Sequence, residues 1–201
     1  MSSTSRLQLL SRVFFYLTIC WTILLGALTI WDIKELKERN TNNLTSQARS
    51  FYKLIVTTRL WNASHGGVYV PVTEATQPNP YLDVVERDIV TDNGQMLTLI
   101  NPAYMTRQLS ELSQQNNGVV FNITSNKPIR PGNAPAKWEA ELLAEFDQIN
   151  TEKYSWSTDR QTGAHSFRYM RALWTQKECL KCHAFQGYEY GVPWGCISVS
   201  H

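Results

Sequence analysis

The sequence is poor in cysteine and carries almost no net charge. Four cysteines among 201 residues exclude a small scaffold held together by disulfides. The formal net charge is only +2, which is too small to indicate a nucleic-acid partner. Aromatic residues are not scarce, with 7 Trp, 9 Tyr and 7 Phe, and this content excludes a disordered chain. The length therefore suits one folded domain with an appendage.

Charge is absent altogether from residues 13–31, a run of nineteen residues. A helix of this length matches a hydrocarbon core about 30 Å thick, and aromatic residues near both ends are typical of an interfacial belt. The alternative is a cleaved secretory signal. The run ends in LTIW at 28–31, and these are poor neighbours for a cleavage site. We therefore expect an uncleaved anchor, in which Cys20 is a small packing residue.

The basic residues Arg6 and Arg12 precede this run without any acidic residue, and the rest of the chain balances 17 basic against 17 acidic side chains. Positive charge beside a membrane span stays in the cytoplasm. We expect residues 1–12 to be a cytoplasmic tip, 13–31 a single-pass transmembrane anchor, and 32–201 an extracytoplasmic domain. A cleaved signal would also export the domain.

Residues 32–61 predict one long helix, in register with the membrane span. Apolar side chains recur at helical spacing, namely Ile33, Leu36, Leu44, Ala48, Phe51, Tyr52 and Ile55. The helix would be about 45 Å long and would end where Asn62, Ser64, Gly66 and Gly67 begin. It could carry a displacement to the membrane or pair two copies of the chain in a homodimer. The simpler interpretation is a spacer that packs on its own domain.

The remaining residues, 65–201, predict an α+β core with an antiparallel sheet and flanking helices. Segments rich in β-branched and aromatic residues predict strands at 68–72, 118–124, 166–173 and 194–200. Helices are expected at 103–115 and 136–149, the second with Pro135 placed to start it. Prolines and asparagines predict loops at 73–83 and 125–135.

The pattern Cys179-Leu180-Lys181-Cys182-His183 carries the chemistry of the sequence. Two thiols three positions apart can add to the two vinyl groups of a haem, and the adjacent imidazole then becomes the proximal iron ligand. Such attachment occurs outside the cytoplasm, where the apolar run independently places the domain. We therefore expect one covalent haem c, held by Cys179 and Cys182, with His183 on the iron.

Three other interpretations of the two thiols were weighed. A zinc site would need four ligands, which Cys179, Cys182, Cys196 and a histidine could supply. A redox CxxC pair would be expected in a thioredoxin-like βαβ setting, which the sequence does not show. A structural disulfide would not require His183. The sequence favours haem attachment and leaves Cys196 as an unpaired thiol in the last strand.

Several stretches together resemble the c-type haem PAS-like domain family, formerly catalogued as a domain of unknown function. They are residues 61–82, 100–108, 123–135, Trp138, 167–171 and 179–200. The resemblance covers nearly all of residues 50–200. It implies a PAS-like fold, a bound haem c and signal input in bacterial histidine kinases and chemoreceptors, which places the domain in the periplasm, anchored in the inner membrane. It implies no catalytic activity.

The sixth iron ligand stays open. Candidates are His65, His165, Met96, Met105 and Met170, or an open or water-filled position. Met105 is preferred because its position matches a motif of the family, and His65 follows for the same reason. A methionine would raise the reduction potential relative to a second histidine. Arg130, Arg168 and Arg171 are candidates for contacts with the haem propionates, because guanidinium groups suit carboxylates.

Two functions are compatible with these features. In the first, a change of iron redox state or binding of a small gas moves the long helix and biases a signalling element. In the second, the domain is a membrane-tethered electron-transfer cytochrome with a redox partner. The balanced charge of the domain favours the sensor, since redox partners are often steered electrostatically. A peroxidase ranks third. The chain ends at Ser200-His201 without a kinase or chemoreceptor segment, so we expect a fragment or a stand-alone member.

Overall fold

The computed structural model describes residues 3–146, 149, 151–159 and 162–200, and leaves out the side chains of residues 3–7, 9, 117, 181 and 182. The chain divides into two compact units, residues 1–46 and 47–201. Each unit is described by itself below.

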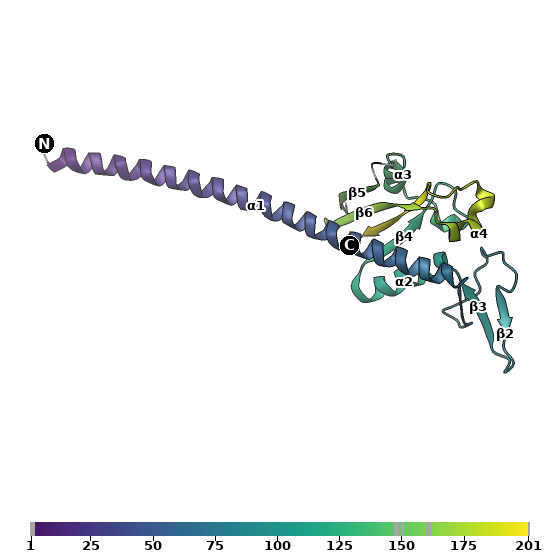
Figure 1. Cartoon of the computed structure of the whole chain (residues 1–201). Coiled ribbons are helices and arrows are strands. Elements are labelled where there is room, and N and C mark those ends of the chain that lie inside the picture. Colours follow the sequence, from purple (N-terminus) through teal and green to yellow (C-terminus); the bar gives the residue numbers. More distant parts are fainter. Residues whose placement is uncertain (1–2, 147–148, 150, 160–161, 201) are drawn as a thin grey trace. The chain divides into compact units, whose positions relative to one another are not determined.

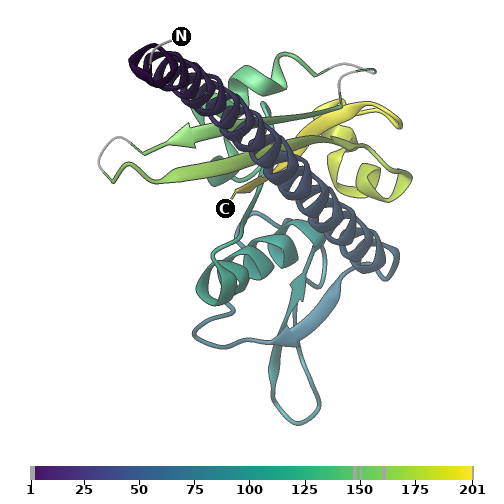
Figure 2. The same ribbon diagram turned by 90° about the vertical axis from the view of Figure 1, so that its left-hand side faces the viewer.

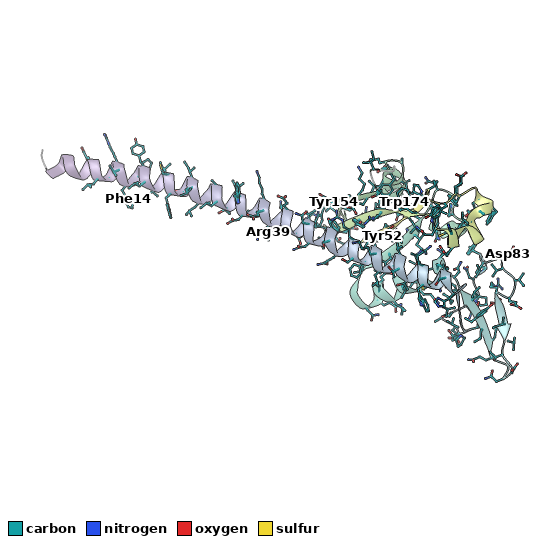
Figure 3. All side chains as sticks on the ribbon, in the orientation of Figure 1. Phe14, Arg39, Tyr52, Asp83, Tyr154 and Trp174 are labelled. Atoms are coloured by element: carbon teal, nitrogen blue, oxygen red, sulfur yellow. The ribbon has the colours of Figure 1, made fainter. Side chains whose placement is uncertain are left out.

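Helix α1 (Ser3–Ser64) forms the described part of the first unit and continues into the second. The predicted helix at 32–61 is therefore confirmed as part of a longer one. Residues 13–31 present exposed apolar side chains, such as Phe14 at 74% exposure, which Figure 3 labels. The hydroxyls of Thr18 and Thr29 donate to carbonyls four residues earlier, at 2.9 and 2.8 Å, as suits an apolar surrounding. By length and composition α1 could cross a membrane.

A three-stranded antiparallel sheet opens the second unit. It contains β1 (Val68–Pro71), β2 (Asp88–Val90) and β3 (Met96–Ile100), in the order β1-β3-β2. Figure 1 shows β2 and β3 as a projecting hairpin. The chain enters β1 through Gly66, whose φ of 77° is accessible to glycine at little cost. This sheet places the end of β3 beside the start of the next helix.

Helix α2 (Pro102–Asn117) follows β3 directly. The Asn101 side chain accepts a hydrogen bond from the backbone N–H of Tyr104 at 2.9 Å, and Pro102 occupies the first turn. Both features are favourable at a helix start. Gly118, with φ 74°, ends the helix in a left-handed conformation. The predicted helix at 103–115 is thus confirmed, with two further residues at its C-terminal end.

A four-stranded antiparallel sheet forms the core of the second unit. Its strands are β4 (Val120–Thr124), β5 (Glu152–Thr158), β6 (His165–Trp174) and β7 (Pro193–Ser200), in the order β4-β7-β6-β5. The central strands β6 and β7 supply the most deeply buried hydrophobic side chains, which are Tyr169, Met170, Ala172, Cys196, Ile197 and Val199. The cavity described below opens at the end of β6 and the start of β7.

The part of α1 that belongs to the second unit is bonded to both sheets. The Tyr52 hydroxyl donates to the carbonyl of Ala172 in β6 at 2.6 Å. Ten residues later, the Asn62 side-chain amide donates to the carbonyl of Ile100 in β3 at 3.0 Å. Both side chains are buried. Figure 2 shows the blue C-terminal end of α1 leading into β1, and residues 52–62 of this end join the two sheets through the two hydrogen bonds.

The sequence predicted four of the seven strands, and three were missed. Strands β2 and β5 lie at sheet edges, where polar residues are common and apolar alternation is weak. Strand β3 reads MLTLI, a short apolar run that periodicity cannot separate from a helix. The predicted loops at 73–83 and 125–135 contain no strand; the second includes the 3-10 turn η1 (Pro131–Asn133).

The helix expected at 136–149 is wrong in its extent, since α3 covers only Lys137–Leu143. After Leu143, the amides of Glu145 and Phe146 bond to carbonyls three residues earlier, at 3.1 and 3.4 Å. Such tighter turns close a helix, and the chain then leads into β5 at Glu152. The helical periodicity of the sequence continued past this point, but pairing with β6 requires the extended strand.

Candidate functional site

The predicted haem-binding motif lies in a short helical segment between β6 and β7. It consists of η2 (Lys177–Cys179), α4 (Leu180–His183) and η3 (Ala184–Gln186), which together we call the attachment segment. Because Cys179 and His183 are four residues apart, they share one side of the segment. Both line the same cavity. The backbone of Cys182 lies in α4, and its side chain lies outside the described residues.

The His183 imidazole is held by neighbours that leave one ring nitrogen available. Its Nδ1 lies 2.5 Å from Oε1 of Gln186, and Nε2 of Gln186 in turn donates to the carbonyl of Lys127 at 2.9 Å. Since a carbonyl oxygen only accepts, Nδ1 carries the proton and Nε2 keeps a lone pair. The ring centroid lies 4.9 Å from that of Trp194. This hydrogen bond and stacking fix the orientation of a neutral, ligating imidazole.

Burial also favours the neutral, ligating form of His183. Removal from water lowers the pKa of His183, while the hydrogen bond that its Nδ1–H donates to Gln186 opposes this and the positive charge of Arg59 adds to it. A lowered pKa favours the neutral ring at physiological pH. Only the neutral ring can donate a nitrogen lone pair to a metal, so the environment suits a ligand.

Two adjoining cavities meet at this imidazole. Their volumes are about 200 and 280 Å³, so the joined space reaches the roughly 300–1,000 Å³ of cofactor pockets. Six residues line both: Leu82, Val84, Asn101, Ala103, His183 and Trp194. Figure 3 labels Tyr52 and Trp174 on the walls of the first cavity and Asp83 on the second. The imidazole therefore stands at the junction of the two spaces.

The first cavity is bounded on one side by α1. Residues Tyr52, Val56, Arg59, Leu60 and Ala63 line it, and we call this the helical wall. Apart from Arg59 and the phenol of Tyr52, the wall is apolar. The attachment segment and Trp194 form the opposite boundary.

The lining fits a haem group chemically. Apolar side chains such as Leu99 and Leu173 face the first cavity, as a porphyrin plane requires. Trp194 lines both cavities, and its indole Nε1 is buried without a hydrogen-bond partner among the described residues, so an acceptor on a bound group could satisfy this donor. Lys127, Arg107 and Arg130 line the second cavity and supply cations for carboxylates. Thiol, imidazole, apolar walls and cations are thus all present.

The five sequence candidates for a distal ligand are not brought to the cavity. None of them is among its described lining residues. Nδ1 of His65 contacts the carbonyl of Trp61 at 2.7 Å at the end of α1, and His165 bonds Thr158 at the β5–β6 turn. Met96 is exposed in β3, Met105 is half-buried in α2, and Met170 is fully buried in the sheet core. His65 thus makes the helix-end contact, and Met170 packs in the core.

Of the three arginines predicted to meet propionates, only Arg130 lines the cavity. It also donates to Oδ1 of Asn133 at 3.1 Å. Arg168 lies over the Trp138 ring at 5.1 Å, and Arg171 pairs with Glu152 at 3.6 Å. Neither Arg168 nor Arg171 is among the described residues that line the two cavities, so a propionate contact from either of them stays a prediction.

Sequence reasoning missed the residues that complete the site. These residues are Arg59 in α1, Gln186 at the end of the attachment segment and Trp194 in β7. No spacing in the sequence identifies Arg59 or Trp194. A weak signal was available for Gln186, three positions after His183. The zinc alternative gains no support: Cys196 is buried in β7 away from the cavity lining, and no three metal-ligating side chains cluster among those described.

Comparison with known proteins gives the family. A family profile described as "Tll0287-like: Tll0287" matches residues 37–189, which is most of the chain. The chain belongs to the Tll0287-like family. Among solved structures, the chain is similar to "Crystal structure of the cyanobacterial heme-protein Tll0287", at 17% identity and a TM-score of 0.48, covering 78% of this chain and 92% of that one. No curated protein matches.

The bounds of the family match show which elements of the fold it covers. It starts within α1 at residue 37, so residues 13–31 lie outside it, and it extends through the whole attachment segment. The family match therefore spans the helical wall and the CxxCH sequence of this chain, whereas the apolar run lies outside it. The α+β architecture with a long N-terminal helix agrees with the fold class expected from the sequence.

Proposed function

We propose that residues 32–201 form an extracytoplasmic haem c sensor domain, anchored in a bacterial inner membrane by residues 13–31. The observation that carries the proposal is the convergence of Cys179 and His183 of a CxxCH motif on one cavity of suitable size and chemistry. Family membership supports it, because the protein that gives the family its name is described as a heme-protein. One haem would be attached through Cys179 and Cys182.

Each residue of the site has a distinct task in this proposal. A bound haem supplies an iron that changes oxidation state and takes up small ligands. Nε2 of His183 is the proximal ligand, and the hydrogen bond to Gln186 holds the ring in the ligating tautomer. Trp194 packs on the imidazole and excludes water from it. Low solvent access and hydrogen bonding at the proximal histidine are the means by which a protein sets the potential of such a group.

The helical wall connects this site to signalling. Four of its five residues lie within two turns of one another, and Tyr52 and Asn62 bond the same helix to both sheets. A change in the cavity therefore acts on a helix that continues, unbroken, to Ser3. Residues 32–46 of that helix would pair two copies of the chain, and the output module would be a kinase or chemoreceptor of the same signalling system. The domain itself would catalyse no reaction.

A second function, electron transfer, is favoured by one observation. Phe185 and Tyr190, beside the proposed attachment point, are 80% and 60% exposed. Exposed aromatic side chains are typical of contact surfaces for other proteins. In this alternative a redox partner docks at the attachment segment and the helical wall is only a support.

The full-length protein, made in a host that attaches haem c and purified in detergent, tests the proposal. Denaturing gels stained for haem and a reduced-minus-oxidised absorption spectrum should show a covalent haem. Hydrogen exchange of residues 52–64 should then change on reduction or on adding CO, with β5 as an internal reference. Absence of covalent haem would refute the proposal. Unchanged exchange together with rapid reduction by a quinol or cytochrome would favour electron transfer.

A further inference from the structure

Arg59 is a buried cation in the helical wall, and no described residue supplies it with a counter-ion. Its side chain is 8% exposed. Nη1 donates to the carbonyl of Pro102 at 3.0 Å and to Oγ1 of Thr106 at 3.1 Å, and both acceptors are neutral. Among the described residues no Asp or Glu pairs with it, whereas Arg49, Arg87 and Arg171 each have a carboxylate.

This arrangement is costly for the protein alone. A buried charge without an opposite charge is unfavourable by several kcal/mol or more. Burial lowers the pKa of Arg59 to about 10, so the guanidinium still carries its proton at neutral pH. A guanidinium has five N–H donors, and the two recorded hydrogen bonds both come from Nη1. Donors on Nε and Nη2 therefore remain for a partner.

The position of Arg59 points to that partner. It lines the first cavity together with Cys179 and His183, and its charge acts on both of them. The cations of the second cavity are in a different situation: Arg107 lies over the Tyr104 ring at 4.3 Å, Arg130 donates to Asn133, and Lys127 is exposed to water. Among the described lining cations, Arg59 is thus the buried one that most lacks a neighbouring negative charge.

We propose that Arg59 is the anion-binding residue of the cofactor cavity, where it holds a carboxylate or a small inorganic anion against the haem. The inference rests on the proposed function for the presence of haem. The anion has two sources of the same chemistry: a haem propionate or a free anion from solution. In either case the guanidinium forms charge-assisted hydrogen bonds, which are the strong ones. A cation near the iron also disfavours the more positive ferric state.

The test compares Arg59→Gln and Arg59→Lys in the haem-loaded full-length protein. Arg168→Gln is the matched control, because Arg168 lies outside the cavity lining. Two quantities are measured for each: the reduction potential, by titration followed in the absorption spectrum, and the azide concentration at half-saturation of the ferric spectrum. Arg59→Lys keeps the charge and should retain most of the wild-type behaviour.

Each source of the anion has its own expected result. If a propionate is bound, Arg59→Gln shifts the redox equilibrium at least tenfold toward ferric iron, about 59 mV for one electron, while the azide concentration at half-saturation stays within twofold of the wild-type value. If a free anion is bound, the wild type responds saturably to azide and Arg59→Gln needs at least tenfold more. The inference is overturned if Arg59→Gln differs by less than twofold from both the wild type and Arg168→Gln on both measurements.

A folding failure of Arg59→Gln would not end the test. Thr106→Val removes one of the two acceptors that hold Nη1 and should shift the same quantity in the same direction by a smaller factor. An unchanged value in Thr106→Val would then overturn the inference. A wild type without covalent haem would instead refute the proposed function, so the two failures are distinguishable.

Discussion

The cavity is bounded by two walls that differ in structure and in chemistry. The attachment segment is built from three short helical turns and carries a thiol and an imidazole. The helical wall belongs to one regular helix and offers apolar side chains with a single buried guanidinium. The first wall can hold a cofactor but is not continuous with a longer element. The second cannot ligate iron through sulfur or imidazole, but it continues toward the N-terminus. In the proposed sensor, binding and transmission therefore belong to different parts of the chain.

The largest effect is expected from the attachment segment. Replacing Cys179 and Cys182 together by Ser removes both thioether positions, so covalent haem should be lost completely. The haem stain on a denaturing gel measures this directly. Cys20→Ala is the control, since Cys20 is exposed on α1, and it should keep full staining. Normal staining in the double variant would contradict the division between the two walls.

A substitution in α1 beside the helical wall should lower the stability of the fold without removing the haem. Asn62→Ala removes the amide that donates to the buried carbonyl of Ile100, and an unsatisfied buried acceptor costs about 1–3 kcal/mol. The free energy of unfolding, measured with urea, should fall by this amount while covalent haem is kept. Asn116→Ala, whose side chain is exposed on α2, should change the free energy much less. Loss of haem in Asn62→Ala would show that the helical wall also controls attachment.

Replacing Gln186 should change the reduction potential of the iron without detaching the haem. Gln186→Leu removes the acceptor for Nδ1–H of His183, which weakens the imidazole as a donor to ferric iron. The reduction potential should rise, by up to a tenfold change in the redox equilibrium constant, or about 59 mV. Gln114→Leu on the exposed face of α2 serves as the control. A potential equal to wild type would mean that this hydrogen bond does not tune the iron.

The smallest effect concerns how α1 is held to the sheet beyond the cavity. Glu152 accepts from Nε of Arg49 at 2.9 Å and also from the Tyr169 hydroxyl at 2.6 Å, and the hydrogen bond from Arg49 is the main cause that lowers the pKa of Glu152. A carboxyl with a depressed folded pKa stabilises the fold above its unfolded pKa, about 4.3, and loses that contribution as the pH falls through the folded value.

Glu152→Gln should therefore reduce stability at pH 7 by about 1 kcal/mol, because the pair is partly exposed. It should also flatten the fall in stability between pH 5 and the lower folded pKa, to the extent of about one proton. Urea unfolding at a series of pH values measures both. Glu145→Gln, at an exposed pair with Lys153, is the control. A pH profile as steep as that of wild type would contradict the role of Glu152.

Local signals predicted the parts of the molecule whose determinants lie close together in the sequence. Helices α1 and α2 follow from apolar spacing and from the Asn101-Pro102 start, and the central strands β6 and β7 follow from dense β-branched and aromatic residues. The edge strands β2 and β5 escaped because they carry polar side chains, and α3 was drawn too long because its end depends on pairing with β6. The proximal histidine and the two haem-attaching thiols are predictions that rest on a single five-residue motif.

The sequence by itself determined the apolar run at 13–31 and the α+β class, and it predicted the attachment chemistry, since each depends on residues within a few turns or strands of one another. The tertiary structure alone decided which distant residues share the cavity. It excluded Met170 by burying it in the sheet core, directed Arg168 and Arg171 elsewhere, and brought Arg59, Gln186 and Trp194 to the imidazole. The physical reason is that contacts between residues far apart in the chain depend on how sheets and helices pack, which no local spacing records.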